Sequence, residues 1–164
     1  MRKIRDIFQK YETDGCSDDG KCSAKIPESF FSLCGEEVRD ALRGSSSGKQ
    51  REMCDCIILD STESRMTLAE LKSGEPKSKM ARHAKNQLSE GMVVLAEMLS
   101  QAGKSEAGLQ LVLFSRRFTN RSAIEELQKP IEYSGRKMRI IRTDCCSDLP
   151  DSYVNVSRND LPSV

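Results

Sequence analysis

Apolar and polar positions follow two different periods along this chain. Residues 53–60 and 66–72 are apolar runs of strand length, and the short polar loop 61–65 between them predicts an antiparallel hairpin. From residue 78 to 101, apolar side chains recur every three or four positions, which predicts an amphipathic helix packed against a sheet. The stripe consists of Met80, Ala84, Leu88, Gly91, Leu95, Met98 and Leu99.

The remaining segments predict shorter elements around this centre. Residues 2–12 predict a helix, and a loop rich in Gly, Asp and Ser follows to about residue 25. A second helix is expected to begin at Pro27 and to end at Gly44, because apolar residues between them recur at helical spacing. These residues are Phe30, Leu33, Cys34, Val38, Ala41 and Leu42. Residues 109–115 and 137–142 predict strands, and residues 122–128 predict a helix.

This order of elements predicts an α/β fold with a mixed central sheet flanked by helices. With 164 residues, the chain has room for one domain with a sizeable core. We divide it into an N-terminal helix with a cysteine-containing loop (1–26), an α/β core (27–146) and a C-terminal tail (147–164). The tail is polar and carries two prolines, so we expect it to be loosely attached.

Composition excludes some partners. The 26 Lys and Arg residues nearly balance 25 Asp and Glu residues, for a net charge of +1, so affinity for a polyanion must come from a local patch. The first residues are too charged for a secretory signal, and no apolar run approaches the roughly 20 residues of a membrane span. We therefore expect a soluble cytoplasmic protein without a membrane partner.

The number and positions of the cysteines also favour a cytoplasmic protein. There are seven, an odd number, and those at 54, 56, 145 and 146 lie in or beside predicted strands, which favours reduced, buried thiols over a disulfide framework. Cys16 and Cys22 lie in the predicted loop. A zinc site there would need two further ligands and has a wider gap than zinc sites usually show, so zinc is the less favoured interpretation.

Asp55, Glu70 and Lys72 are the candidate chemical residues. Side chains alternate along a strand, so Glu70 and Lys72 share one side, roughly 7 Å apart along the chain. Pairing of the two strands brings Asp55 beside them. Hard cations such as Mg²⁺ prefer oxygen ligands, which the two carboxylates and the backbone carbonyl of Leu71 can supply. Lys72 can then orient or deprotonate an attacking water.

Asp55, followed by Glu70-Leu71-Lys72, a long helix and an apolar strand, resembles the PD-(D/E)xK nuclease superfamily. The resemblance implies a restriction endonuclease-like core, one or two Mg²⁺ ions, which Mn²⁺ can replace, and hydrolysis of phosphodiester bonds. It covers residues 28–142 as an order of elements, although few positions carry the motif. The proline of the family's motif is absent, because Cys54 precedes Asp55.

The same resemblance assigns roles residue by residue. Asp55 and Glu70 match the family's metal-binding acids, and Lys72 matches its lysine. Many members add an acidic residue on the first helix, which Glu37 or Glu36 can supply. Gln87 matches a polar residue that several branches carry on the helix after the lysine.

A structural interpretation competes with each assignment. Glu-x-Lys on a strand is often only a salt bridge on a solvated face, and Gln87 can equally bond a backbone group. The only histidine, His83, is more typical of an exposed or satisfied residue than of a catalyst. An Asp in an apolar strand is costly unless it is used, and this favours the site.

Positive charge gathers beside the motif and supplies candidate nucleic-acid contacts. These residues are Lys77, Lys79, Arg82, Lys85, Arg116 and Arg117. The sequence thus predicts a Mg²⁺-dependent nuclease, with DNA favoured over RNA as the substrate. The alternative is a non-catalytic nucleic-acid-binding or scaffolding subunit with the same fold. The small size leaves a homodimer or a partner protein open.

Overall fold

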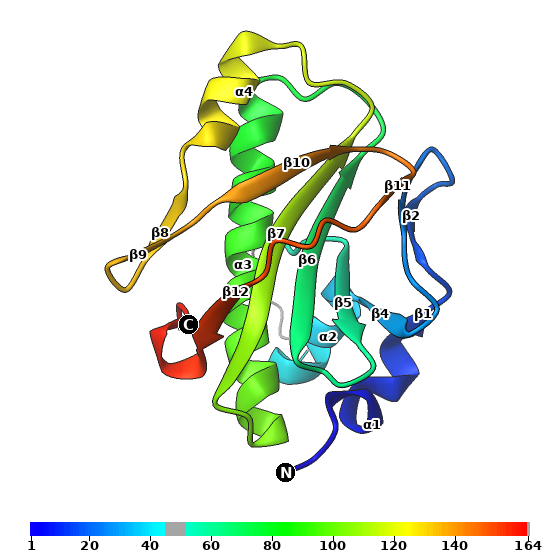
Figure 1. The fold of residues 1–164 in the computed structure, drawn as a ribbon, viewed down its shortest axis with the longest axis vertical. Coiled ribbons are helices and arrows are strands. Elements are labelled where there is room, and N and C mark those ends of the chain that lie inside the picture. The colour runs from blue at the N-terminus through cyan, green and yellow to red at the C-terminus, as the bar shows by residue number, and fades with distance from the viewer. Residues whose placement is uncertain (45–51, 164) are drawn as a thin grey trace.

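The computed structural model describes residues 1–44 and 52–163, and a mixed sheet of seven strands forms its frame (Figure 1). The strands of this sheet are β1 (Glu12–Thr13), β4 (Phe30–Cys34), β5 (Cys56–Asp60), β6 (Arg65–Lys72), β7 (Glu106–Ser115), β10 (Ile140–Asp144) and β12 (Val154–Ser157). They lie in the order β1-β4-β5-β6-β7-β10, and β12 pairs with the first half of β7. The predicted mixed α/β fold is therefore confirmed.

The directions of the central strands bring several strand ends together. β4, β5 and β6 are antiparallel to one another in turn, whereas β6, β7 and β10 run parallel. Lys72 at the end of β6 is level with Ser115 at the end of β7 and with Asp144 at the end of β10. Because β5 runs the opposite way, it begins at this same end of the sheet. We call this end, where β5 begins and β6, β7 and β10 finish, the site end.

Four helices lie on one side of the sheet within the described residues, and the last of them packs mainly on the long third helix. They are α1 (Ile4–Phe8), α2 (Gly35–Arg43), α3 (Ser78–Ala102) and α4 (Arg121–Gln128). The long helix α3 packs against β6 and β7 and begins near the site end (Figure 1). No helix in the described part of the chain is long and apolar enough to cross a membrane.

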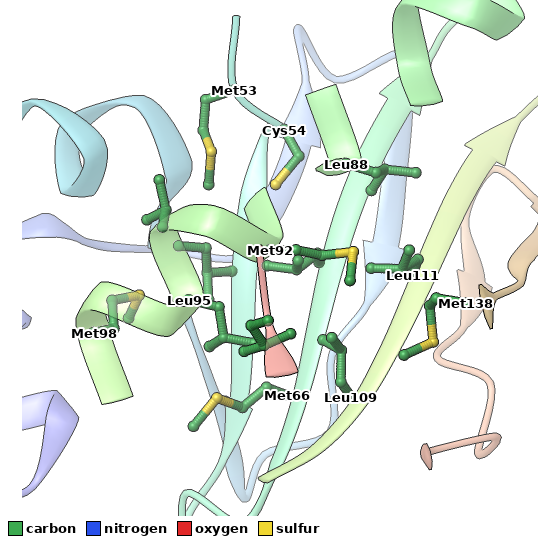
Figure 2. Packing of buried hydrophobic residues seen from close by; sticks show 14 of the residues in the cluster. Met53, Cys54, Met66, Leu88, Met92, Leu95, Met98, Leu109, Leu111 and Met138 are labelled. Carbon is green, nitrogen blue, oxygen red and sulfur yellow. The ribbon is translucent and has the colours of Figure 1, made fainter. Parts of the chain in front are cut away.

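The main core lies between α3 and the sheet. Leu88, Met92 and Leu95 of α3 pack against side chains of β6 and β7 such as Met66 and Leu109 (Figure 2). All five are inaccessible to solvent, and full burial of one such side chain contributes about 1.5–3 kcal/mol. This packing fixes where α3 stands relative to β6, and so where its polar side chains reach.

The second face of the sheet has a different cover, the hairpin formed by β2 (Cys16–Asp18) and β3 (Cys22–Lys25). Cys16, Cys22 and Ala24 of the hairpin pack on the apolar residues of the sheet's second face. These are Cys56, Ile58, Ala69, Leu71, Val112 and Phe114. The short strand β11 (Ser147–Asp148) extends the hairpin by pairing with β3.

Two disulfides attach this hairpin to the sheet, which contradicts the prediction of reduced thiols. Cys16 bonds Cys56 at the start of β5, and Cys22 bonds Cys145 just after β10. Cys34, Cys54 and Cys146 remain free. The zinc alternative fails for the same reason, because the sulfurs of Cys16 and Cys22 are already covalently bonded. The residues around Cys16 and Cys22 predicted a loop, whereas the cysteines bonded to them lie 40 and 123 positions away in the sequence.

Two further expectations were wrong. Residues 30–34 form strand β4 rather than the first half of a helix, because their backbone pairs with β5 along its whole length. The C-terminal tail is packed rather than loosely attached: β12 pairs with β7, and Val156 and Leu161 are buried. Gln110 on β7 also holds the tail, by donating to the carbonyl of Pro150 at 2.7 Å.

The predicted strand 137–142 is divided between two elements. Its first part lies in β9 (Arg136–Met138), which forms a separate hairpin with β8 (Ile131–Tyr133). Its second part begins β10, which joins the main sheet. Single-turn 3₁₀ helices at Gln9–Tyr11 and Arg158–Asp160 complete the described elements.

Candidate functional site

Glu70, Lys72 and Gln87 meet at the site end of the sheet. Alternation along β6 places Glu70 and Lys72 on the face that α3 covers, where Lys72 Nζ lies 2.8 Å from Glu70 Oε1. Lys72 Nζ also donates to Gln87 Oε1 on α3, at 3.4 Å. The amide of Gln87 in turn donates to the backbone carbonyl of Met53 at 3.3 Å. Gln87 therefore connects the lysine to the segment that leads into β5.

Asp55 is held against the same strand by two crossed hydrogen bonds. The N–H of Leu71 donates to Asp55 Oδ2 at 2.8 Å, and the N–H of Asp55 donates to Glu70 Oε2 at 3.2 Å. A third bond runs from the N–H of Gly35 to the carbonyl of Asp55, at 3.0 Å. The backbone of Asp55 is thus tied both to β6 and to the start of α2. All four residues predicted as catalytic lie in one connected cluster.

The two carboxylates have perturbed proton affinities. Glu70 is only 1 % exposed, and burial, followed by repulsion from Asp55, raises its pKa to about 8 despite the ion pair with Lys72. The pKa of Asp55 is also raised, by burial first, against the opposing effects of the Leu71 N–H and Lys72. Asp18 and Glu36 add further repulsion to Asp55. Both pKa shifts oppose ionisation of the two carboxyl groups, and a cation bound between them would favour their charged forms.

The donor atoms suit a hard cation in part. No hydrogen bond from residues 1–44 or 52–163 reaches Asp55 Oδ1, which is available as a ligand. Both oxygens of Glu70 already accept bonds, from Lys72 and from the N–H of Asp55. Among the described residues, no three His, Cys, Asp or Glu side chains are grouped closely enough to hold a metal ion. A cation at Asp55 and Glu70 would therefore complete its shell with water, as Mg²⁺ usually does.

The other predicted ligands have different positions. Glu36 and Glu37 are both exposed in the first turn of α2, and Glu36 is among the groups that raise the pKa of Asp55. The acidic role expected on that helix stays a prediction for either residue. The side chain of Leu71 packs on the second face of the sheet. Its backbone carbonyl as a ligand stays a prediction.

Most of the predicted nucleic-acid contacts are exposed near the site end. Lys77 precedes the first turn of α3, Lys79 and Arg82 follow within that helix, and Arg116 and Arg117 come directly after β7. Lys85 differs from the rest. It is half-buried, donates to the backbone carbonyl of Glu126 at 3.2 Å and lies 3.5 Å from its carboxylate, so α4 already engages its charge.

Two residues near this site have other partners or were not foreseen. His83 Nε2 contacts the carboxylate of Glu52, and both side chains are exposed, in keeping with a surface residue rather than a catalyst. Asp18, which influences Asp55, lies in a segment predicted to be a loop. No local sequence signal could have found it, because the disulfides bring its hairpin to the site end.

Comparison of the chain with protein-family models, with curated proteins and with solved structures found no significant match.

Proposed function

We propose that this protein is a Mg²⁺-dependent nuclease that hydrolyses phosphodiester bonds, in DNA rather than RNA. The observation that carries the proposal is the single connected cluster of Asp55, Glu70, Lys72 and Gln87 at the site end. A buried carboxylate beside a second carboxylate and a lysine is expensive to fold, and such perturbed groups concentrate at functional sites.

The order of elements supports a finer fold assignment. We propose that β4, β5, β6, α3 and β7 form a restriction endonuclease-like core, in which three antiparallel strands are followed by a helix and a parallel strand. Asp55 directly precedes β5, and Glu70 and Lys72 end β6. These are the places at which the superfamily resemblance expects the two acids and the lysine.

Each side chain of the cluster has a distinct task in the proposed reaction. Asp55 and Glu70 would hold the cation, which supplies positive charge that polarises the phosphodiester. Lys72 would donate to the attacking water or to the negative charge that develops on the phosphate. Gln87, which accepts from Lys72, keeps the ammonium group oriented toward that position. Lys79, Arg82 and the arginines after β7 would contact the backbone of the substrate.

One observation favours a second function, that of a non-catalytic nucleic-acid-binding or scaffolding subunit. The raised pKa of Glu70, about 8, keeps much of this carboxyl group protonated near neutral pH, although Lys72 Nζ lies 2.8 Å from it. Glu70 must then lose its proton before it can bind a cation, and this deprotonation costs free energy. A binding subunit would retain the basic residues without that requirement.

A cleavage assay separates the two functions. Purified protein is incubated with labelled linear, circular, branched and single-stranded DNA, and with RNA, in Mg²⁺, Mn²⁺ or EDTA. The nuclease proposal predicts cutting in Mg²⁺ or Mn²⁺ that is lost in EDTA and in Lys72→Ala, but kept in the control Lys137→Ala, whose side chain is exposed on β9. Tight binding without cutting would support the subunit, and absence of binding to every substrate would contradict both.

A further inference from the structure

Cys34 is a free cysteine that lies directly opposite a disulfide-bonded one. The antiparallel register of β4 and β5 pairs it with Cys56, which bonds Cys16 of the β2–β3 hairpin. Directly opposed residues present their side chains on the same face of a sheet. That face is the one the hairpin covers, because Phe30, four positions before Cys34 on β4, packs there with Cys56. A thiol and a disulfide therefore lie side by side under the hairpin.

The hydrogen bonds around Cys34 and Cys56 place the two residues at the shorter of the two spacings in an antiparallel ladder. Opposed residues alternate between hydrogen-bonded pairs, with Cα atoms about 5.5 Å apart, and non-hydrogen-bonded pairs, with Cα atoms about 4.5 Å apart. The N–H of Gly35, which follows Cys34, donates to the carbonyl of Asp55, which precedes Cys56, at 3.0 Å. This bond makes Cys34 and Cys56 a non-hydrogen-bonded pair. Its spacing lies within the range of roughly 4.4–6.8 Å that a disulfide spans between Cα atoms.

The other two free cysteines have different surroundings. Cys54 lies in the main core on the opposite face of the sheet (Figure 2), where its sulfur would meet a Cβ added at Gly91 on α3. The sulfur of Cys146 accepts from the hydroxyl of Ser23 at 3.4 Å. Ser23 lies between two residues of β3 that pack on the sheet, so its side chain points away from the sheet. Of the free thiols in the described part of the chain, Cys34 alone is opposed to a disulfide on its own face.

We propose that Cys16, Cys34 and Cys56 form a thiol–disulfide exchange centre with two covalent states. The thiolate of Cys34 attacks the sulfur of Cys56, so that a Cys34–Cys56 bond forms and the Cys16–Cys56 bond breaks. Cys16 leaves as a thiolate and takes up the proton that Cys34 released. One disulfide and one thiol are present before and after the step, so it needs no oxidant or reductant. The centre exists whether or not the candidate site cleaves nucleic acid.

The exchange changes which segments the disulfide joins. In the first state, Cys16–Cys56 attaches β2 to the sheet. In the second, Cys34–Cys56 joins β4 to β5, whose backbones are already paired. The hairpin then keeps Cys22–Cys145, its packing on the sheet and its pairing with β11. Cys16 becomes a thiol that can bond a small external thiol such as glutathione.

Disulfide mapping by mass spectrometry of the full chain tests the pairing. Cys16→Ser removes the first partner of Cys56 and leaves the two opposed thiols. In a mixture of reduced and oxidised glutathione, this variant should form Cys34–Cys56, while one glutathione disulfide takes up two electrons and two protons and becomes two glutathione molecules. Cys16→Ser/Cys54→Ser is the matched control and should form the same link. Cys16→Ser/Cys34→Ser should lose it.

The wild type should show the exchange without any oxidant. After incubation at neutral pH, the protein is quenched in acid, its thiols are alkylated, and it is digested with pepsin. A minor fraction of the chains should carry Cys34–Cys56 and a free Cys16, with the total of three free thiols unchanged. Cys34→Ser should contain only the links Cys16–Cys56 and Cys22–Cys145.

Two results would overturn the exchange centre. One is a folded Cys16→Ser protein in which Cys56 is recovered as a free thiol, as a glutathione adduct or linked to Cys54. The other is a wild type in which no Cys34–Cys56 link is found. Should Cys16→Ser not fold, as judged by circular dichroism, the comparison of the wild type with Cys34→Ser still decides the matter.

Discussion

Lys72 and Glu70 lie on one face of β6 with Nζ and Oε1 2.8 Å apart, in a place where Glu70 is almost completely withdrawn from solvent. The ion pair stabilises the charged carboxylate, but burial and the neighbouring Asp55 outweigh it, and the pKa of Glu70 is raised to about 8. Glu70 therefore links the folding of the protein to pH.

Stability should fall as pH rises from about 4.5 to about 8. The unfolded chain releases the Glu70 proton above its ordinary pKa, whereas the folded chain retains it up to the raised pKa, so the folded state binds more protons throughout this window. The free energy of unfolding should drop across it by an amount on the order of a few kcal/mol. Urea denaturation of the wild type and of Glu70→Gln at several pH values measures this effect.

A control for Glu70→Gln should remove a carboxylate that is exposed to solvent. Glu106→Gln removes an exposed carboxylate at the other end of β7 and should keep the pH dependence of the wild type. Glu70→Gln should flatten it. An equal pH dependence in Glu70→Gln and the wild type would show that Glu70 does not titrate abnormally in the folded protein.

Gly35 is predicted to be essential for the position of Asp55. A Cβ at Gly35 would lie 2.1 Å from the carbonyl oxygen of Cys54, and the N–H of Gly35 holds the carbonyl of Asp55. Alanine normally favours a helix over glycine by about 1 kcal/mol, but the clash here should reverse the sign and destabilise the protein by about 1–3 kcal/mol. Thermal denaturation of Gly35→Ala tests this.

Gly74→Ala is the matched control for that substitution. An added Cβ there meets no atom within 4 Å, and the backbone of Gly74 needs no left-handed conformation. Its unfolding temperature should stay close to that of the wild type. A Gly35→Ala protein as stable as Gly74→Ala would mean that α2 and the Asp55 segment do not approach each other as closely as the structure indicates.

The central geometry could be predicted from sequence because it depends on local patterns. Alternation along 66–72 is sufficient to put Glu70 and Lys72 on one face, and a short polar loop is sufficient to pair their strand with the one after Asp55. The apolar stripe of α3 also identified the face from which Gln87 projects. These features do not require knowledge of distant parts of the chain.

The errors concern segments whose structure depends on distant partners. Residues 30–34 carry apolar side chains on both faces, and only pairing with β5 shows that they form a strand. Cys16 and Cys56 are separated by 40 positions, and Cys22 and Cys145 by 123. Residue spacing alone cannot identify such pairs, so the sequence did not predict the hairpin or the position of Asp18.

The disulfides can be checked by counting thiols. Alkylation with iodoacetamide in denaturant, without reductant, should modify three cysteines per chain, and reduction beforehand should raise this to all seven. Peptide mapping should recover Cys16 linked to Cys56 and Cys22 linked to Cys145. Seven modified cysteines in the unreduced protein would support the original expectation of free thiols instead.

The exposed basic residues at the start of α3 should make nucleic-acid binding depend on salt. Each phosphate contact that is removed should lower the slope of log affinity against log salt concentration by about 1. Lys79→Gln/Arg82→Gln should therefore reduce the slope by about 2 for any DNA sequence. Fluorescence anisotropy at several salt concentrations measures it.

A charge-matched control for this experiment lies at the opposite end of α3. Arg2 and Lys3 are exposed, and the N–H of Arg2 donates to the carbonyl of Ala102 in the last turn of that helix. Arg2→Gln/Lys3→Gln removes the same charge and should leave the slope nearly unchanged. Equal effects of the two double variants would indicate a response to net charge and no defined binding surface.

The most direct test of the account is single-turnover cleavage of DNA in Mg²⁺ by Glu70→Gln, Lys72→Ala and the double variant. Residues that act as one catalytic unit show strongly non-additive losses. We expect each single variant to lose at least about 100-fold in rate, in the range of general acid–base and charge stabilisation, and the double variant to lose little more than the worse single one. Cleavage by Lys72→Ala at the wild-type rate would contradict the proposal that Glu70 and Lys72 form the hydrolytic site.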